Sequence, residues 1–154
     1  MVQNQNSINF HKQLFQYSCI PMSVELLLKL LERVPYDYFE LQTEWGNKRS
    51  GHYRNFDGKI IAGVQFKIQF DVSRNDDFPI EELFRTIEDE LKNGKYVIIS
   101  LLLNGGWYSC VVYDQLSNGE FRAVTRGRDK NEIENVCEIV RNMKGTDILT
   151  YTIL

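Results

Sequence analysis

Apolar residues recur at helical spacing in two stretches of the chain. Between Pro21 and Arg33 they stand three and four residues apart, so that one broad face of a helix would be apolar. The stretch from Ile80 to Leu91 has the same period and is followed by Asn93-Gly94, a common helix end. Pro21 suits a first helical turn, where its missing N–H is not needed. The pattern therefore predicts two amphipathic helices.

Shorter apolar patterns predict strands in much of the remaining chain. Alternating apolar and polar residues at 60–71 are typical of a half-buried strand. The unbroken apolar run Tyr96–Leu103 is typical of a central strand that is buried on both faces. The other predicted elements are a polar lead-in at 1–12, a short helix with loops at 36–58, strands at 107–113, 120–125 and 147–154, and a short helix at 129–142.

The order of these elements predicts the fold class. Helices come first and a mostly antiparallel sheet follows, which is an α+β layout. The chain has 154 residues, of which 43% are hydrophobic, so a core can form without metals or disulfides. We therefore expect a single domain over residues 1–154.

Charge and hydropathy narrow the range of partners. The formal net charge is −3 and the pI is about 5.4, so no basic field attracts nucleic acid. A small basic cluster is interpreted as a solvated strand end and turn; it comprises Arg122, Arg126, Arg128 and Lys130. The polar N-terminus lacks the features of a signal peptide, and no apolar run is long enough to span a bilayer. We expect a cytoplasmic protein that does not contact membranes.

Cysteine and histidine are scarce. The three cysteines, Cys19, Cys110 and Cys137, are odd in number and far apart, which argues against a disulfide framework. With only two histidines, His11 and His52, and no closely spaced cysteine pair, we expect neither a metal nor another cofactor. Core packing is a sufficient role for Cys110 and Cys137.

The segment 13–23 carries the residues best suited to chemistry. Cys19 stands at the start of the first predicted helix, where the positive end of the helix dipole favours the nucleophilic thiolate. Gln13, six residues earlier, can donate its side-chain N–H to an oxyanion on an attacked carbonyl, with the Cys19 backbone N–H as second donor. Taken alone, Cys19 could equally be a buried structural thiol, since free cysteine is often buried.

This segment resembles the papain-like cysteine peptidase superfamily, most closely the small bacterial branch that includes the leader-processing peptidases of peptide-exporting transporters. Those proteins carry a glutamine, five further residues, a cysteine, often a proline soon after it, and a long apolar helix. The matching residues here are Gln13, Cys19, Pro21 and Leu26–Leu28. Ile20 stands where they usually have glycine. Two later segments resemble the family in order and spacing, namely 91–100 and 105–114. The resemblance implies a papain-like fold, in which the helix that carries the cysteine packs on a twisted antiparallel sheet.

The catalytic histidine of that family is missing from its expected place. By pattern Tyr108 holds the position, with Trp107 or Gly106 as alternatives if the register differs. The residue that orients the imidazole in such a triad would be Thr125 or, later in the chain, Asp129. Tyrosine, with a pKa of about 10, is a poor general base at neutral pH.

The sequence contains two histidines, His11 and His52, that could in principle replace the missing catalytic base. His52 lies in the glycine-flanked loop Ser50–Tyr53, which could fold over an active site and supply a rescue base. His11 precedes the segment of Gln13, and we interpret it as a surface residue.

Two functions remain open from the sequence. In the first, the protein is a thiol hydrolase or acyltransferase that acts on a peptide or amide, with Cys19 as nucleophile and Gln13 as oxyanion donor. In the second, it is an inactive pseudo-peptidase that binds a peptide or protein partner in the vestigial cleft; degenerate members of the transporter-linked branch bind rather than cut. The oligomeric state is left open.

Overall fold

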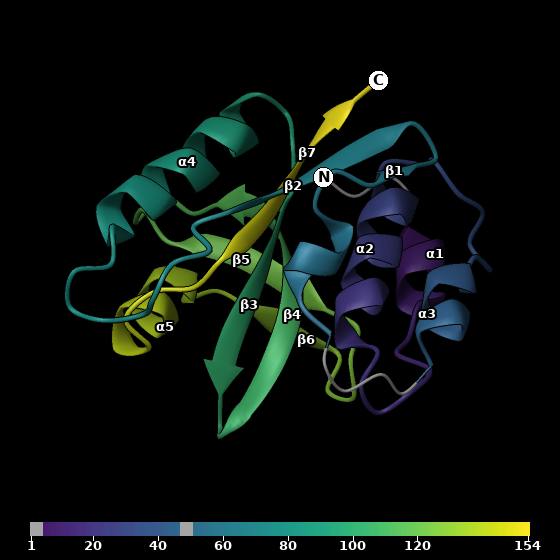
Figure 1. Ribbon diagram of the computed structural model, residues 1–154, viewed down its shortest axis with the longest axis horizontal. Coiled ribbons are helices and arrows are strands. Elements are labelled where there is room, and N and C mark those ends of the chain that lie inside the picture. Colours follow the sequence, from purple (N-terminus) through teal and green to yellow (C-terminus); the bar gives the residue numbers. More distant parts are fainter. Residues whose placement is uncertain (1–4, 47–50) are drawn as a thin grey trace.

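The computed structural model describes residues 5–46 and 51–154, so the first four residues of the predicted lead-in and residues 47–50 of the predicted loop region lie outside the description. Helices cover both faces of a seven-stranded antiparallel sheet (Figure 1), which confirms the α+β class. The elements in chain order are α1 (Gln5–Phe10), α2 (Cys19–Leu30), α3 (Glu40–Trp45), the short 3-10 helix η1 (Tyr53–Phe56), β1 (Ile60–Ile61), β2 (Val64–Gln69), α4 (Ile80–Lys92), β3 (Val97–Leu103), β4 (Gly106–Gln115), β5 (Phe121–Thr125), β6 (Asn131–Ile133), α5 (Val136–Asn142) and β7 (Ile148–Ile153).

The C-terminal strand lies inside the sheet rather than at its edge. The strand order is β1-β2-β7-β3-β4-β5-β6, and every neighbouring pair is antiparallel. β3 therefore has a partner on each side, as expected for the apolar run Tyr96–Leu103. β7 joins the early hairpin β1–β2 to the later strands, so residues from both halves of the chain meet along it.

The predicted strand at 60–71 is in fact a hairpin. Ala62 and Gly63 both have positive φ, at 52° and 77°, and reverse the chain between β1 and β2. Turns of this kind match the twist of antiparallel strands. The predicted apolar alternation from Val64 onward is confirmed, since Val64 and Phe66 are buried in the core.

Two hydrophobic clusters hold the layers together, one on each face of the sheet. α4 and α5 pack on one face and α2 on the other, with α1 and α3 beside α2 (Figure 1). Consecutive side chains of a strand point to opposite faces of the sheet, so Ile98 packs in the cluster on the α2 side and Ile99 in the cluster on the α4 side. Cys110 lies in the α4-side core, as expected, and Cys137 packs against the same cluster.

α2 is enclosed on all sides. Every residue from Pro21 to Leu30 is buried, including Glu25 and Lys29, because α1 and α3 cover the face that the sheet leaves open. The sequence predicted a helix with one apolar face. That prediction was incomplete, since the polar face is also covered.

Three other expectations need correction. The lead-in 1–12 contains α1, and Ile8 is buried against α2. The segment predicted as a helix at 129–142 begins with β6 and becomes helical only at Val136. Arg126 of the supposedly solvated basic cluster is only 8% exposed, because its guanidinium turns inward and donates to the Ile8 carbonyl.

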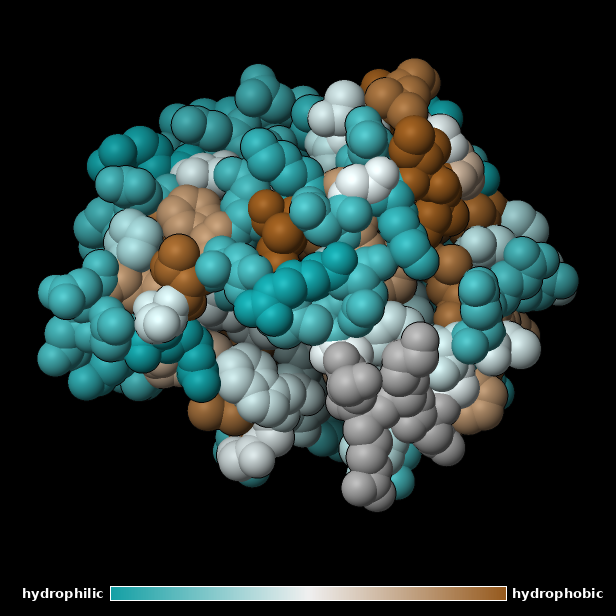
Figure 2. Space-filling view, viewed as in Figure 1, coloured by the Kyte–Doolittle hydropathy of each residue, from teal (hydrophilic) through white to brown (hydrophobic). Residues whose placement is uncertain are grey.

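An apolar surface patch lies at the C-terminal end of β7. Exposed apolar side chains gather at the upper right of Figure 2, where β1 and the C-terminal end of β7 lie in Figure 1; the exposed residues there are Ile60, Ile153 and Leu154. Across residues 5–46 and 51–154, no helix combines the length and apolar character that crossing a membrane would require.

Candidate functional site

A single cavity of about 1080 Å³ contacts all six residues that the sequence singled out as catalytic candidates. They come from distant parts of the chain: the loop before α2, the segment before η1, β4, and the end of β5 with the loop after it. The six residues are Gln13, Cys19, His52, Tyr108, Thr125 and Asp129. Gly106 and Trp107, the alternatives for the histidine position, line the same cavity.

Cys19 is the first residue of α2 and is half-buried. Burial raises the pKa of its thiol, while hydrogen bonds from the backbone N–H groups of Cys19 and Ile20 act in the opposite direction. Burial has the larger effect, because a thiolate is costly to desolvate. At neutral pH, Cys19 therefore carries a neutral thiol.

Gln13 lies at the cavity wall with its side-chain amide already engaged. The Nε2 group donates to the carbonyl of Phe15 at 2.7 Å and to that of Gln16 at 3.0 Å. The backbone N–H of Gln13 donates to the Arg126 carbonyl, which ties this loop to the end of β5. In this conformation both amide hydrogens hold the turn before Cys19, so an oxyanion would have to displace a backbone carbonyl.

Tyr108, at the expected histidine position, forms a pair with Asp129. Its hydroxyl donates to the Asp129 carboxylate at 2.9 Å. This hydrogen bond, with partial burial, raises the pKa of Tyr108 above its ordinary value of 10.0. The hydroxyl therefore keeps its proton at neutral pH and cannot accept one from Cys19.

Thr125, the other candidate for the orienting position, is buried at the end of β5 and makes a local contact. Its hydroxyl accepts the backbone N–H of Gly127 at 3.3 Å. Gly127 passes close to Gln13, and a Cβ on it would lie 3.1 Å from the Gln13 Oε1 atom. A side chain here would push against the Gln13 amide, so glycine at this position permits the close approach of the two segments.

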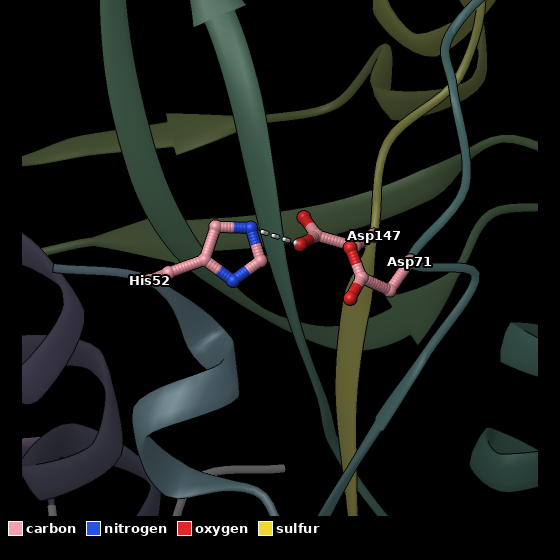
Figure 3. Close-up of side chains that lie close together, drawn as sticks. All are labelled: His52, Asp71 and Asp147. Carbon is pink, nitrogen blue, oxygen red and sulfur yellow. Dashed lines mark ion pairs between the residues drawn. The ribbon is translucent and has the colours of Figure 1, made fainter. Parts of the chain in front are cut away.

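His52 precedes η1 and has both ring nitrogens occupied. Its Nδ1 accepts the backbone N–H of Arg54 at 3.0 Å, as an N-cap of η1. Its Nε2 lies 3.2 Å from the Asp147 carboxylate, and Figure 3 marks this contact with a dashed line. Because Nδ1 is an acceptor, the ring hydrogen must be on Nε2, where it is donated to Asp147. In this arrangement the ring has no free lone pair to serve as a base for Cys19.

Asp71 joins His52 and Asp147 in a cluster of three side chains (Figure 3). Their potential metal-ligating atoms lie within 4.8 Å of one another. The Arg54 guanidinium makes a bidentate contact with Asp71, at 2.6 and 2.7 Å. A metal would need the Nε2 lone pair, but Nε2 carries the hydrogen, and it would also have to displace Arg54 from Asp71. The geometry therefore fits an ion-pair cluster better than a metal site.

The sequence reasoning missed Asp147, Asp71 and Arg54 as residues of this cavity. Burial raises the pKa of the Asp147 carboxyl, and its contact with His52 opposes this effect. Nothing in the local pattern of these residues marks them, because an isolated aspartate or arginine is typical of exposed loops. Their role follows only from the meeting of 52–54, 71 and 147 in space.

The remainder of the cavity combines polar groups with exposed aromatic surface. Inside, the buried Tyr53 hydroxyl lies 2.8 Å from the Ser109 hydroxyl. At the rim, Trp107 is 51% exposed, and the guanidinium of Arg74 lies 4.8 Å from the centre of its ring. Such a surface offers both apolar contact and hydrogen bonding to a ligand.

His11 is wholly buried, so the surface interpretation was wrong. Its ring stacks on Phe39 at 5.3 Å between centroids, Nε2 contacts the Met22 carbonyl at 2.9 Å, and Nδ1 lies 2.7 Å from the Lys29 ammonium. Burial and the nearby Lys29 charge lower its pKa to about 3. A neutral ring then donates from Nε2 and accepts from Lys29, which gives His11 a structural place behind α2.

Comparison with known proteins adds no assignment: neither a protein-family model nor a curated protein sequence matches this chain.

Proposed function

We propose that this chain is a papain-like pseudo-peptidase, which binds a peptide or a segment of a partner protein in the cavity beside Cys19 and does not cleave it. One observation carries this proposal: the position expected for the catalytic base holds Tyr108, whose hydroxyl donates to Asp129. A protonated phenol in that position can bind a ligand through a hydrogen bond, but it cannot activate a thiol.

The surroundings of Cys19 support the same function. Thiol attack needs a thiolate or a base that can generate one, and burial raises the pKa of Cys19. His52, the other candidate base in the cavity, has its two nitrogens committed to Arg54 and Asp147. The amide of Gln13 is likewise engaged with backbone carbonyls.

The cavity suits a peptide in size and chemistry. Its volume of about 1080 Å³ lies just above the range of about 300–1,000 Å³ that is usual for small-molecule pockets. The charges around it are of both signs, since two arginines and two aspartates line it: Arg54, Arg74, Asp71 and Asp147. A peptide offers apolar side chains for Trp107 and backbone amides for the polar groups.

A second function, thiol hydrolysis, is favoured by one specific observation. The thiol of Cys19 stands at the N-terminus of α2 and accepts hydrogen bonds from two backbone N–H groups there, which lower its pKa in part. A ligand that displaced the Gln13 amide from its carbonyl partners would gain an oxyanion donor. The experiment must therefore distinguish binding from cleavage.

The test begins with a displayed library of random peptides selected against the purified protein. Affinity of a selected peptide is measured by fluorescence anisotropy, and its mass is followed during a long incubation. We expect binding with an unchanged peptide mass, and a loss of about tenfold in affinity in Trp107→Ala, the effect of about 1.4 kcal/mol from an exposed aromatic contact. Ile153→Ala is the matched control, because this exposed residue lies at the opposite end of β7 from the cavity residue Asp147.

Other results would point elsewhere. Peptide fragments produced by the wild-type protein but not by Cys19→Ser would establish the hydrolase. Equal affinity of the wild-type protein and Trp107→Ala would mean that the peptide does not occupy the cavity.

A further inference from the structure

A buried glutamine outside the cavity makes four hydrogen bonds, three to the loop before α2 and one to a glutamate of α2. Gln42 on α3 is fully buried. Its Nε2 donates to the Lys12 carbonyl at 2.9 Å and to Glu25 Oε1 at 2.7 Å. Its Oε1 accepts the backbone N–H of Leu14 at 2.7 Å and the Ser18 hydroxyl at 2.8 Å. These four bonds use the full capacity of a glutamine side chain.

Glu25 determines which way the Gln42 amide points. The other carboxylate oxygen of Glu25 accepts the backbone N–H groups of Leu41 and Gln42, in the first turn of α3, at 2.9 and 3.1 Å. An ionised Glu25 only accepts and the backbone N–H of Leu14 only donates, so the amide nitrogen of Gln42 faces Glu25 and its oxygen faces Leu14. The amide oxygen is then directed at the Leu14 N–H and the Ser18 hydroxyl.

The residues held in this way flank two of the candidate catalytic residues of the cavity, Gln13 and Cys19. Lys12 and Leu14 flank Gln13, and Ser18 immediately precedes Cys19. They lie 24 to 30 positions away from Gln42 along the chain, so no local turn could hold them there. Ser18 has no side-chain capping bond to the α2 backbone, and its hydroxyl contacts the Phe15 carbonyl and Gln42 instead.

We propose that Gln42, oriented by Glu25, is a positioning residue for the cavity: it holds the loop 12–18 against the start of α2 and so sets the places of Gln13 and Cys19. This inference rests on the proposed function only in treating the cavity as the peptide site. The positioning itself is a property of the free protein.

The main test compares Gln42→Leu with the wild-type protein by the rate at which iodoacetamide alkylates Cys19. Peptide mass spectrometry identifies alkylation at Cys19, and its rate is measured across a range of pH. Circular dichroism checks that each variant is folded under these conditions. We expect Gln42→Leu to raise the rate by about tenfold, because a loop that has lost these hydrogen bonds opens more often. Gln65→Leu, on the distant strand β2, is the matched control and should leave the rate unchanged within about twofold.

A rescue variant separates the directed hydrogen bonds from a general packing effect. Gln42→Glu places two carboxyl groups together and should raise the rate in the same way. The exchange Glu25→Gln with Gln42→Glu lets the new amide donate to the new carboxylate, which still accepts from Leu14 and Ser18. We expect the exchanged protein to react more slowly than Gln42→Glu but faster than the wild type, because a carboxylate oxygen then faces the Lys12 carbonyl where Nε2 donated before.

Three results would overturn the inference. The first is a folded Gln42→Leu whose Cys19 rate and pH profile match those of the wild type. The second is an exchanged protein that reacts as fast as Gln42→Glu. If both single variants fail to fold, hydrogen exchange of the wild-type protein decides: the Leu14 N–H should be protected as strongly as the helical N–H groups of α3, and exchange at the rate of an exposed loop would contradict the proposal.

The peptide result does not affect these outcomes. Alkylation and hydrogen exchange need no ligand, so they test Gln42 even if no peptide binds. If a peptide does bind, Gln42→Leu should weaken it by a similar factor of about ten.

Discussion

The buried carboxyl of Glu25 should make the stability of this protein depend on pH in an unusual direction. Glu25 lies on the fully enclosed helix α2 and accepts three N–H groups from Leu41 and Gln42. These bonds and the charge of Lys29 lower its pKa, but burial prevails and raises the pKa to about 7. The perturbation is Glu25→Gln, which removes the titration and keeps the shape of the side chain.

The magnitude follows from the difference between the folded and unfolded states. The pKa of Glu25 rises from 4.5 to about 7 on folding, and each pH unit of that difference corresponds to about 1.4 kcal/mol, so the full effect is about 3 kcal/mol. The folded protein binds the extra proton between these two values. The contribution of Glu25 to stability is therefore fully present below pH 4.5 and is lost as the pH rises through 7.

The assay is urea unfolding of the wild-type protein and Glu25→Gln at intervals between pH 4.5 and 7.5. Subtracting the two free energies of unfolding removes the effects of groups common to both proteins, such as His11. The pKa of Lys29 is lowered to about 8 by burial and is coupled to Glu25, so higher pH is avoided. We expect the stability of the wild type relative to the variant to fall by about 3 kcal/mol across this range.

Two results would refute this reasoning. A difference between the proteins that does not change with pH would mean that Glu25 has an ordinary pKa in the folded state. A wild type that gains relative stability as the pH rises would mean that the hydrogen bonds and Lys29 outweigh burial.

Three further predictions concern the core, the thiol and the ion-pair cluster. Leu27→Ala should lower the free energy of unfolding in urea by about 2–5 kcal/mol, because Leu27 is fully buried; a loss below 1 kcal/mol would contradict this. Alkylation of Cys19 should have its midpoint above pH 9, since burial raises its pKa from 9.0, and a midpoint near 7 would favour the hydrolase. Zinc or EDTA should leave the thermal unfolding temperature unchanged, whereas saturable stabilisation by zinc that His52→Ala abolishes would show a metal site.

Much of the secondary structure was predictable because each pattern depends on neighbours in the chain. The apolar periods predicted the two long helices and the buried strand Tyr96–Leu103, with boundaries that differ from the observed ones by at most three residues. The hairpin at 60–69 and the start of β6 were missed. In both places a short turn or strand pairing, rather than a long period, decides the local structure.

The candidate site was predictable in part. Spacing and resemblance selected six residues, and all of them line one cavity. The partners that determine their chemistry were not selected, because Asp147 and Arg54 carry no local signal. Two charged residues, Glu25 and Lys29, do carry a local signal, because they interrupt an otherwise apolar helix. Charged residues in such a helix are either on a solvated face or buried with partners.

The amino-acid sequence by itself determined the helices, the central strand and a cysteine at a helix start, since these depend on periods of a few residues and on the preferences of proline and glycine. Only the tertiary structure decided that α2 is enclosed, that His11 is buried and that Tyr108 donates to Asp129. It also decided that Gln42 holds the loop before Cys19. The physical reason is that burial and hydrogen bonding depend on which distant segments meet, and those meetings set the pKa of each group and the partners left for a ligand.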